Sequence, residues 1–255
     1  MTGDDKRCRS AFVTGASYGF GAAIALRLAR DGFAVAVSAT DVKNLADIVA
    51  RLDAVGVRTA AIALDLRDPD DVRRAMNRAV DALGGVDLLV NNAAANLRRS
   101  ALEVTREEWD AVLATNLTGP FFLTQQMAHG LMRAGRPGSI VNIASTHGLI
   151  GAAERSTYGV SKAAMIQMTR MLAVEWGPHR IRVNAVAPGR ALTESPSRAA
   201  TAAKPGYVDR MIERIPLRRL VTAEDVAAAV GYLASAQAAS VTGQVLTVDG
   251  GLTIS

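Results

Sequence analysis

The chain has 255 residues, of which 49% are hydrophobic and 21% charged, so it can bury a sizeable core and wholesale disorder is excluded. Its one cysteine, Cys8, excludes an intrachain disulfide framework and fits a reducing compartment such as the cytoplasm. The N-terminal residues are polar and charged, and no apolar run reaches the length of about 18 residues expected of a membrane helix. We therefore expect neither a signal peptide nor a membrane span.

The net charge of +5 does not predict a nucleic-acid partner. Arginines supply most of the positive charge, but they are scattered or paired, as in Arg73 and Arg74, rather than aligned along one helix. Aromatic residues make up only 4% of the chain, too few for obvious base-stacking platforms. We expect a small-molecule ligand, with no nucleic-acid or membrane partner.

Short aliphatic segments alternate with longer helical patterns along the chain. The candidate strands, apolar throughout as expected for strands covered on both faces, are Ala11–Val13, Ala34–Ala39, Ala60–Leu64, Val86–Asn91, Ser139–Ile143, Ile181–Val186 and Val245–Val248. Helical patterns cover Gly21–Arg30 and Val42–Val55, and others begin at the N-cap Asp68 and at a capping box formed by Thr105 and Glu108. This alternation predicts an α/β fold with a parallel sheet and right-handed crossovers.

We expect one domain over residues 1–255, with its core in residues 8–255. The chain shows no internal repeat and no convincing linker. One irregular stretch, Gly189–Tyr207, is rich in Ala, Ser, Pro and Thr and is long enough to form a lid. Residues 189–215 are therefore the predicted substrate-loop region.

The first predicted strand leads into a glycine-rich turn that opens directly into a helix. Gly15 permits a tight turn, Gly19 and Gly21 permit close approach, and the helix offers free N–H groups to a pyrophosphate. A glycine triplet alone is a weak signal, because structural turns also use glycine, but here the strand before it and the helix after it are both in place. We expect nucleotide binding by this turn, whose residues are Gly15, Ser17, Tyr18, Gly19, Phe20 and Gly21.

The end of the second predicted strand bears on the choice between NAD(H) and NADP(H). An acidic residue there would bind the ribose 2′-hydroxyl and repel a 2′-phosphate. The neutral Thr40 occupies this position and could donate to a phosphate, with Lys43 nearby. Asp41 argues the other way, and neither expected position holds an arginine. On balance the sequence favours NADP(H) over NAD(H).

Tyr158 and Lys162 lie four residues apart at the start of a long helical pattern, so both project from one helical face. Ser145 follows a predicted strand at its carboxyl end, where open α/β sheets bind ligands. Each residue alone has a structural explanation, as a packed tyrosine, a solvated lysine or a turn serine. Their conjunction with the glycine turn indicates a catalytic site.

In these motifs the chain resembles the short-chain dehydrogenase/reductase family in its single-domain form. The matching features are TGASYGFG at 14–21, Asp65, Asn91-Asn92-Ala93-Ala94, Asn116, Ser145, Tyr158-Gly-Val-Ser-Lys162, Pro188-Gly189, Thr193 and Val248-Asp249-Gly250-Gly251. Ala94 departs from the pattern, because the family commonly has glycine there. The resemblance implies a Rossmann-type, doubly wound sheet of about seven mainly parallel strands with helices on both faces.

The resemblance also implies catalytic roles. Tyr158 would be the general acid in carbonyl reduction and the base in alcohol oxidation, although a free phenol has a pKa near 10. The Lys162 ammonium, together with the positive nicotinamide ring, would lower that pKa by stabilising the phenolate, and Lys162 would also hold the nicotinamide ribose. Ser145 would hydrogen-bond the substrate oxygen, and Asn116 would position a water that links Lys162 to solvent.

Further cofactor contacts are implied by the same resemblance. Asp65, with its neighbour Leu66, would contact adenine, Asn92 would flank the cofactor, and Pro188, Gly189 and Thr193 would lie on the carboxamide side. For Asn91 we favour a structural role, in which its amide ties neighbouring strands together. No metal site is expected, because the histidines show no metal-ligand spacing.

The substrate would lie between the loops that follow the fourth, fifth and sixth strands. Arg98, Arg155 and Arg190 fall in these loops and would suit a carboxylate or phosphate, and His147 is a further candidate for the pocket. For each of these residues, a role as an ordinary surface side chain is at least as good an explanation.

The substrate class stays open between two resemblances. Asn96-Leu97-Arg98-Arg99 and the segment Glu175–His179 are similar to those of dehydrogenases of sugar acids such as gluconate, whereas the overall pattern also resembles 3-oxoacyl-[acyl-carrier-protein] reductases. We expect interconversion of a secondary alcohol and a ketone on a small, polar, anionic substrate.

Two further expectations concern turnover and assembly. A non-catalytic dinucleotide sensor or scaffold is the alternative from another class, and it is disfavoured because Asn116, Ser145, Tyr158 and Lys162 are all present. The resemblance further implies a homotetramer, built from the long helices that contain Asn116 and Tyr158 and from the C-terminal strand.

Overall fold

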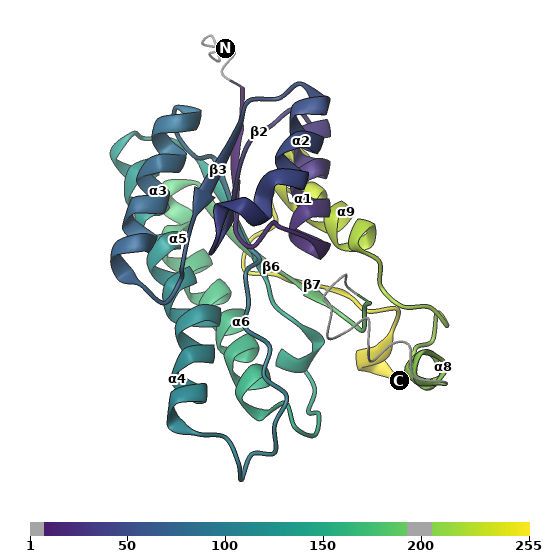
Figure 1. Cartoon of the computed structure of the whole chain (residues 1–255). Helices are drawn as coiled ribbons and strands as arrows, with labels where there is room; N and C mark the ends of the chain where they lie inside the picture. The colour runs from purple at the N-terminus through teal and green to yellow at the C-terminus, as the bar shows by residue number, and fades with distance from the viewer. Residues whose placement is uncertain (1–7, 193–205) are drawn as a thin grey trace.

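The computed structural model describes residues 8–192 and 206–255 (Figure 1). Within these residues seven strands form one sheet in the order β3-β2-β1-β4-β5-β6-β7, and every neighbouring pair is parallel. The strands are β1 (Ser10–Val13), β2 (Ala34–Ala39), β3 (Thr59–Ala63), β4 (Leu88–Asn91), β5 (Gly138–Ile143), β6 (Ile181–Pro188) and β7 (Val245–Val248). The predicted Rossmann-type, doubly wound α/β fold is confirmed, with each predicted strand in place and its ends shifted by two residues or fewer.

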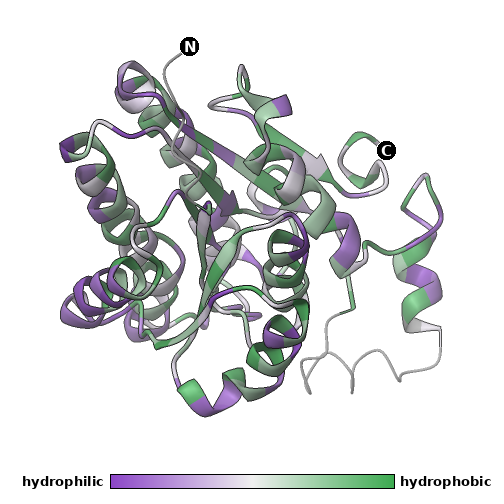
Figure 2. Cartoon of the chain, turned by 90° about the horizontal axis from the view of Figure 1, so that it is seen from above, coloured by the Kyte–Doolittle hydropathy of each residue, from purple (hydrophilic) through white to green (hydrophobic). Residues whose placement is uncertain are grey.

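Helices cover both faces of the sheet. One layer contains α1 (Gly19–Arg30), α2 (Ala46–Val55) and α9 (Ala223–Ala234), and the other contains α3 (Pro69–Leu83), α5 (Gly119–Arg133) and α6 (Ser156–Trp176). Seen from above, the helices turn hydrophobic faces toward the sheet and hydrophilic faces outward (Figure 2). The shorter α4 (Arg106–Leu113) and α8 (Tyr207–Ile212) lie toward the lower end of the molecule in Figure 1.

Adjacent residues of the central strands enter opposite cores. Phe12 of β1 packs in the core beneath α3, α5 and α6, whereas Val13 packs in the core beneath α1, α2 and α9. Both side chains are fully buried. The central strands are mostly apolar because helices cover both faces of the sheet there.

Local signals place most helix ends where the sequence predicts them. The Asp68 side chain accepts a hydrogen bond from the Asp70 N–H at the start of α3, and Thr105 and Glu108 form the predicted capping box of α4. The helix predicted over Val42–Val55 is divided into a 3-10 turn over Val42–Leu45 and then α2. In the described part of the chain, no helix is both long and apolar enough to cross a membrane.

The strand order reverses beside β1, which lies between β2 and β4. The connections that leave β1 and β4 therefore run to opposite faces of the sheet and leave a crevice beyond the carboxyl ends of the strands. The glycine turn after β1 and the loops after β4, β5 and β6 surround this position.

Candidate active site

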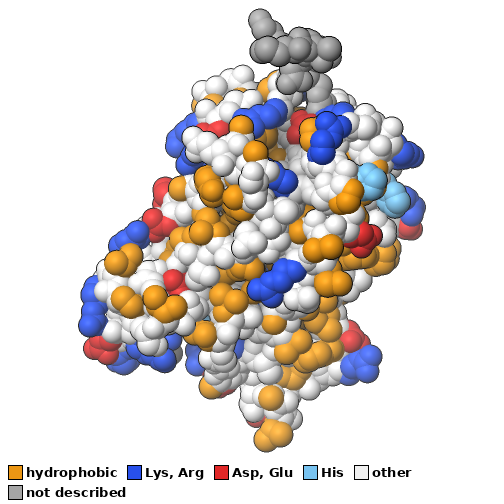
Figure 3. All heavy atoms as spheres, turned by 180° about the vertical axis from the view of Figure 1, so that it is seen from behind, with side chains coloured by type: hydrophobic (Ala, Val, Ile, Leu, Met, Phe, Trp, Pro, Cys, Tyr) orange, Lys and Arg blue, Asp and Glu red, His pale blue; other side chains and the backbone are white. Residues whose placement is uncertain are grey.

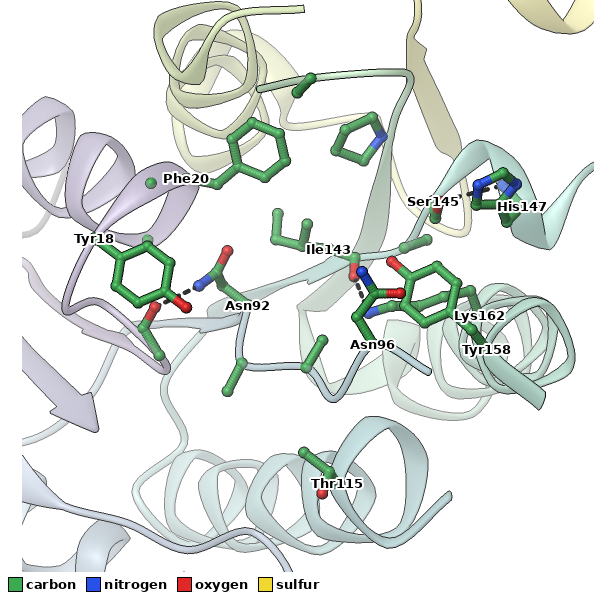
Figure 4. A pocket seen from close by; sticks show the side chains of 18 of the residues that line it. Tyr18, Phe20, Asn92, Asn96, Thr115, Ile143, Ser145, His147, Tyr158 and Lys162 are labelled. Atoms are coloured by element: carbon green, nitrogen blue, oxygen red, sulfur yellow. Dashed lines mark hydrogen bonds between the residues drawn. The ribbon is translucent and has the colours of Figure 1, made fainter. Parts of the chain in front are cut away.

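One cleft of about 1090 Å³ runs along the carboxyl edge of the sheet. Tyr18 and Phe20 lie at one end of it, and Ser145, Tyr158 and Lys162 lie at the other (Figure 4). The structure brings the following predicted site residues to this cleft: Gly15, Ser17, Tyr18, Gly19, Phe20, Gly21, Thr40, Asn92, Arg98, Ser145, His147, Arg155, Tyr158, Lys162, Pro188, Gly189 and Arg190.

The glycine turn fits a dinucleotide. Gly15 has a φ of 64°, and a Cβ on Gly21 would lie 2.3 Å from the Gly15 carbonyl oxygen, so both positions require glycine. The Asn92 amide donates to the carbonyls of Thr14 (2.9 Å) and Gly15 (2.8 Å), which fixes the turn to the end of β4. At the N-cap of α1, Tyr18 makes no side-chain capping bond, and the first turn contains no acidic residue. The first N–H groups of this helix can therefore bind a pyrophosphate.

The end of β2 presents neutral side chains to the cleft. Thr40 and Asn44 both line it, whereas Asp41 does not. The Asp41 carboxylate instead accepts a hydrogen bond from the Lys43 N–H at 2.9 Å and caps the 3-10 turn that follows. Asn44 is a lining residue that the sequence analysis missed, because its approach to the cleft depends on that turn.

Lys162 is buried to 1% exposure, and its Nζ donates to the Ile143 carbonyl oxygen at 2.7 Å. Burial lowers the pKa of this amine from 10.5 to about 7. Nζ lies 5.8 Å from the centroid of the Tyr158 ring, so the ammonium and the phenol face the same part of the cleft. Ile143, the last residue of β5, thus orients a lysine that belongs to α6.

The loop after β5 packs closely on α6 and so sets Ser145 opposite Tyr158. A Cβ on Gly148 would lie 2.8 Å from the Lys162 carbonyl carbon, and one on Gly159 would lie 2.9 Å from the His147 carbonyl oxygen. Ser145 Oγ accepts from the His147 N–H at 3.2 Å. The His147 ring stands edge-on to the Tyr158 ring, with 6.1 Å between centroids.

Asn116 lies in a π-helical turn (Ala114–Thr118) between α4 and α5 and is fully buried. Its side chain accepts from the Ala95 N–H at 2.7 Å and donates to the Ala95 carbonyl and to Ser161 Oγ, both at 2.9 Å. Ser161 Oγ in turn donates to the Tyr158 carbonyl at 2.7 Å. Asn116 therefore connects the loop after β4 to the backbone of Tyr158. The water that it was expected to position stays a prediction.

Two other expected cofactor residues, Asp65 and Leu66, do not line the cleft. Asp65 is paired with Arg67 at 2.6 Å, which holds the pKa of that carboxyl below its ordinary value. Leu66 is buried, and its carbonyl packs against Gly119 at the start of α5. Thr193 lies outside the described residues, as do residues 193–205 of the predicted substrate loop.

The structural role expected for Asn91 is confirmed. Its side-chain nitrogen donates to Asn142 Oδ1 of β5 and to Thr124 Oγ1 of α5, both at 2.8 Å. The amide thus ties two neighbouring strands to the helix that covers them.

Two of the candidate substrate arginines join the loops on either side of the cleft. Arg98 Nε lies 2.6 Å from Glu154 Oε2, and Arg155 Nη1 donates to Asn96 Oδ1. The Arg99 N–H also donates to the Glu154 carbonyl at 3.0 Å. Glu154 adopts a left-handed backbone conformation with a φ of 61°. Arg190 also lines the cleft, and Arg210 of α8, which the sequence analysis did not single out, joins it there.

The seven-stranded sheet and the cleft at its carboxyl edge define a Rossmann-fold protein, and comparisons with known proteins give the family. A family model described as "Enoyl-(Acyl carrier protein) reductase" matches residues 15–253. The 3-oxoacyl-[acyl-carrier-protein] reductase FabG of Staphylococcus epidermidis is 37% identical over 245 residues, which cover 96% of this chain and 98% of the relative. The chain belongs to the short-chain dehydrogenase/reductase family.

Solved structures agree with this assignment. A proposed short-chain alcohol dehydrogenase from Sinorhizobium meliloti superposes with a TM-score of 0.92 at 39% identity, covering 97% of each chain. A proposed 2-deoxy-d-gluconate 3-dehydrogenase from Agrobacterium tumefaciens, with bound NADP, superposes with a TM-score of 0.87 at 35% identity, covering 96% of each chain.

Proposed function

We propose that this protein is an NADP(H)-dependent oxidoreductase that interconverts a secondary alcohol and a ketone on a small, polar, anionic substrate such as a sugar acid. The observation that carries the proposal is the meeting of Ser145, Tyr158 and Lys162 in the same cleft as the glycine turn. Such a convergence of polar groups on one cleft is expected of an active site.

When bound, the cofactor supplies or accepts the hydride, and the protein supplies the proton and the orientation. Tyr158 would donate its proton to the carbonyl oxygen in reduction and accept one from the alcohol in oxidation. The Lys162 ammonium, oriented by Ile143, would stabilise the phenolate. Ser145 Oγ accepts from the His147 N–H, which leaves its own O–H to donate to the substrate oxygen as charge develops there.

Four observations support NADP(H) over NAD(H). Thr40 at the end of β2 is neutral, and the Asp41 carboxylate is directed to the Lys43 N–H. None of the described residues that line the cleft is an aspartate or a glutamate, so no acid there would repel a 2′-phosphate. The bound NADP of the Agrobacterium relative agrees with this preference.

Similarity to FabG favours a second candidate, reduction of a 3-oxoacyl thioester carried by an acyl carrier protein. Both reactions use the same three side chains, so only the substrate separates them. We would measure rates with NADPH or NADP⁺ on sugar acids, polyols and 3-oxoacyl thioesters. Activity confined to apolar steroids or terpenoids would contradict both candidates, and activity confined to the thioesters would favour the second.

A homotetramer is supported by apolar side chains exposed on the helices of one layer. Phe122 lies on α5, and Val160, Met171 and Val174 lie on α6, with Val174 at 82% exposure. Ile254, near the C-terminus, is 89% exposed. Light scattering should give four times the mass of the chain, and a monomer mass would contradict this.

The single cysteine, which fits a reducing compartment, supports a location in the cytoplasm.

A small-molecule ligand, rather than nucleic acid, is supported by the surface. On the face shown in Figure 3, lysine and arginine side chains are dispersed among acidic and apolar ones instead of forming a single basic stripe.

A further inference from the structure

The cleft is lined by basic side chains without acidic ones. Five cations line it, namely Arg98, Arg155, Lys162, Arg190 and Arg210, and none of its described lining residues is an aspartate or a glutamate. A cleft lined by one sign of charge focuses the electric field and concentrates ligands of the opposite sign. The cations that are not already bound to the protein can bind such a ligand.

Three of the five cationic side chains already bind other residues of the protein. Arg98 is paired with Glu154 at 2.6 Å, and Arg155 donates to Asn96 Oδ1 and, at 3.4 Å, to the Leu97 carbonyl. Lys162 donates to the Ile143 carbonyl beside Tyr158, at the proposed reacting centre.

Arg190 and Arg210 differ from these three, because neither side chain forms an ion pair or a hydrogen bond with a described residue. Two acids near them in the chain or the fold, Asp249 and Asp209, have other partners or face another way. The Asp249 carboxylate accepts from the N–H groups of Gly251 and Thr253 and from Thr253 Oγ1, each at 2.8 Å. Asp209 directly precedes Arg210, and consecutive residues on a helix do not face each other.

The fold brings the two arginines to the same region through one turn after β7. A Cβ on Gly189, the residue before Arg190, would lie 2.7 Å from Asp249 Cα. The segment after α8 contacts the same turn, because the Leu217 N–H donates to the Gly250 carbonyl at 3.0 Å. Figure 1 shows α8 close to the C-terminal segment that follows β7. The residues that follow β6, which include Arg190, and the segment that follows Arg210 therefore both pack on the turn at Asp249 and Gly250.

We propose that Arg190 and Arg210 form a subsite for the substrate's carboxylate, so that the substrate class is a hydroxy acid or the corresponding oxo acid. The inference rests on the proposed oxidoreductase function and assigns the recognition of the anion to two residues. A guanidinium binds a carboxylate through two parallel hydrogen bonds, which fixes the orientation of the acid as well as its charge. Arg190 follows Pro188 and Gly189 and lines the same cleft as Ser145 and Tyr158, so a carboxylate bound there would lie in the cleft that holds the proposed reacting centre.

The experiment compares pairs of probes that differ in charge. With NADPH, acetoacetate is compared with methyl acetoacetate, and with NADP⁺, D-gluconate is compared with D-glucitol. We expect the wild-type protein to prefer the acid of at least one pair, measured as kcat/KM. Arg190→Gln and Arg210→Gln should each reduce kcat/KM for that acid about 10- to 100-fold and leave the neutral partner nearly unchanged. Arg51→Gln on α2 is the matched control for net charge, since Arg51 is paired with Asp47 outside the cleft.

Three other outcomes would overturn the carboxylate subsite, and a fourth would contradict the proposed function. Equal or better use of the neutral partner by the wild-type protein overturns the carboxylate subsite but leaves the oxidoreductase function intact. A higher dissociation constant for NADPH in the two variants overturns the carboxylate subsite, because it assigns these arginines to cofactor binding. A kcat/KM that is higher for S-acetoacetyl phosphopantetheine than for S-acetoacetyl pantetheine, and that falls in the two variants, overturns the carboxylate subsite in favour of a phosphate subsite. Turnover of no probe at all contradicts the proposed function itself.

Discussion

Replacing Lys162 by methionine should change how the stability of this protein depends on pH. The amine is fully enclosed, and burial lowers its pKa to about 7 in the folded protein from 10.5 in an exposed chain. Between these two values the unfolded chain binds more protons than the folded one, so the free energy of unfolding rises with pH. Below about pH 7 both states are protonated, and the unfavourable burial of the ammonium is present in full.

The size of the effect follows from the two pKa values. Integrated from about pH 7 to about pH 10, the linkage adds about 3 kcal/mol to the free energy of unfolding. Lys162→Met removes this contribution. It also removes the hydrogen bond to the Ile143 carbonyl, which both the ammonium and the neutral amine can donate. The wild-type protein should therefore become more stable relative to the variant by about 3 kcal/mol as the pH rises.

The assay is equilibrium unfolding in urea, followed by circular dichroism at one protein concentration, because assembly would otherwise shift the midpoints. Lys43→Met is the matched control, since Lys43 is exposed and its replacement should leave the pH dependence as in the wild type. A difference in unfolding free energy between wild type and Lys162→Met that is the same at both ends of the pH range would refute the reasoning.

Three further predictions concern the cleft. Gly21→Ala should abolish NADPH binding and destabilise the fold, because its Cβ would lie 2.3 Å from the Gly15 carbonyl oxygen; calorimetric binding of NADPH at wild-type affinity would contradict this. Thr40→Asp should shift the ratio of NADH to NADPH affinity at least about tenfold toward NADH, whereas Thr40→Ser, the matched control, should preserve the preference. Ser145→Ala should lower kcat by about 10²- to 10³-fold with an unchanged NADPH dissociation constant, and an unchanged kcat would remove Ser145 from the mechanism.

The sequence predicts the parts of this site that depend on local pattern. The glycine turn, the i, i+4 spacing of Tyr158 and Lys162, and the position of Ser145 after a strand are each encoded within a few residues. Parallel strands then bring these segments to one edge of the sheet, as the strand–helix alternation predicts.

The sequence does not predict the partners of side chains that lie far apart in the chain. Arg98 and Arg155 were candidates for binding substrate, yet they contact Glu154 and Asn96 across the two loops. Arg210 was not singled out, because nothing in its local sequence places α8 beside the cleft. Such contacts arise from loop conformations and tertiary packing, which hydrophobic periodicity does not describe.

Tyr158→Phe tests the central claim most directly. The variant lacks only the phenolic oxygen, so it cannot transfer the proton, while the glycine turn and the neutral end of β2 remain to bind the cofactor. We predict an NADPH dissociation constant equal to that of the wild type, and turnover of the substrate found in the panel reduced by about 10²- to 10⁴-fold. Undiminished turnover with normal NADPH binding would contradict the assignment of Tyr158 as the proton donor and acceptor of this cleft.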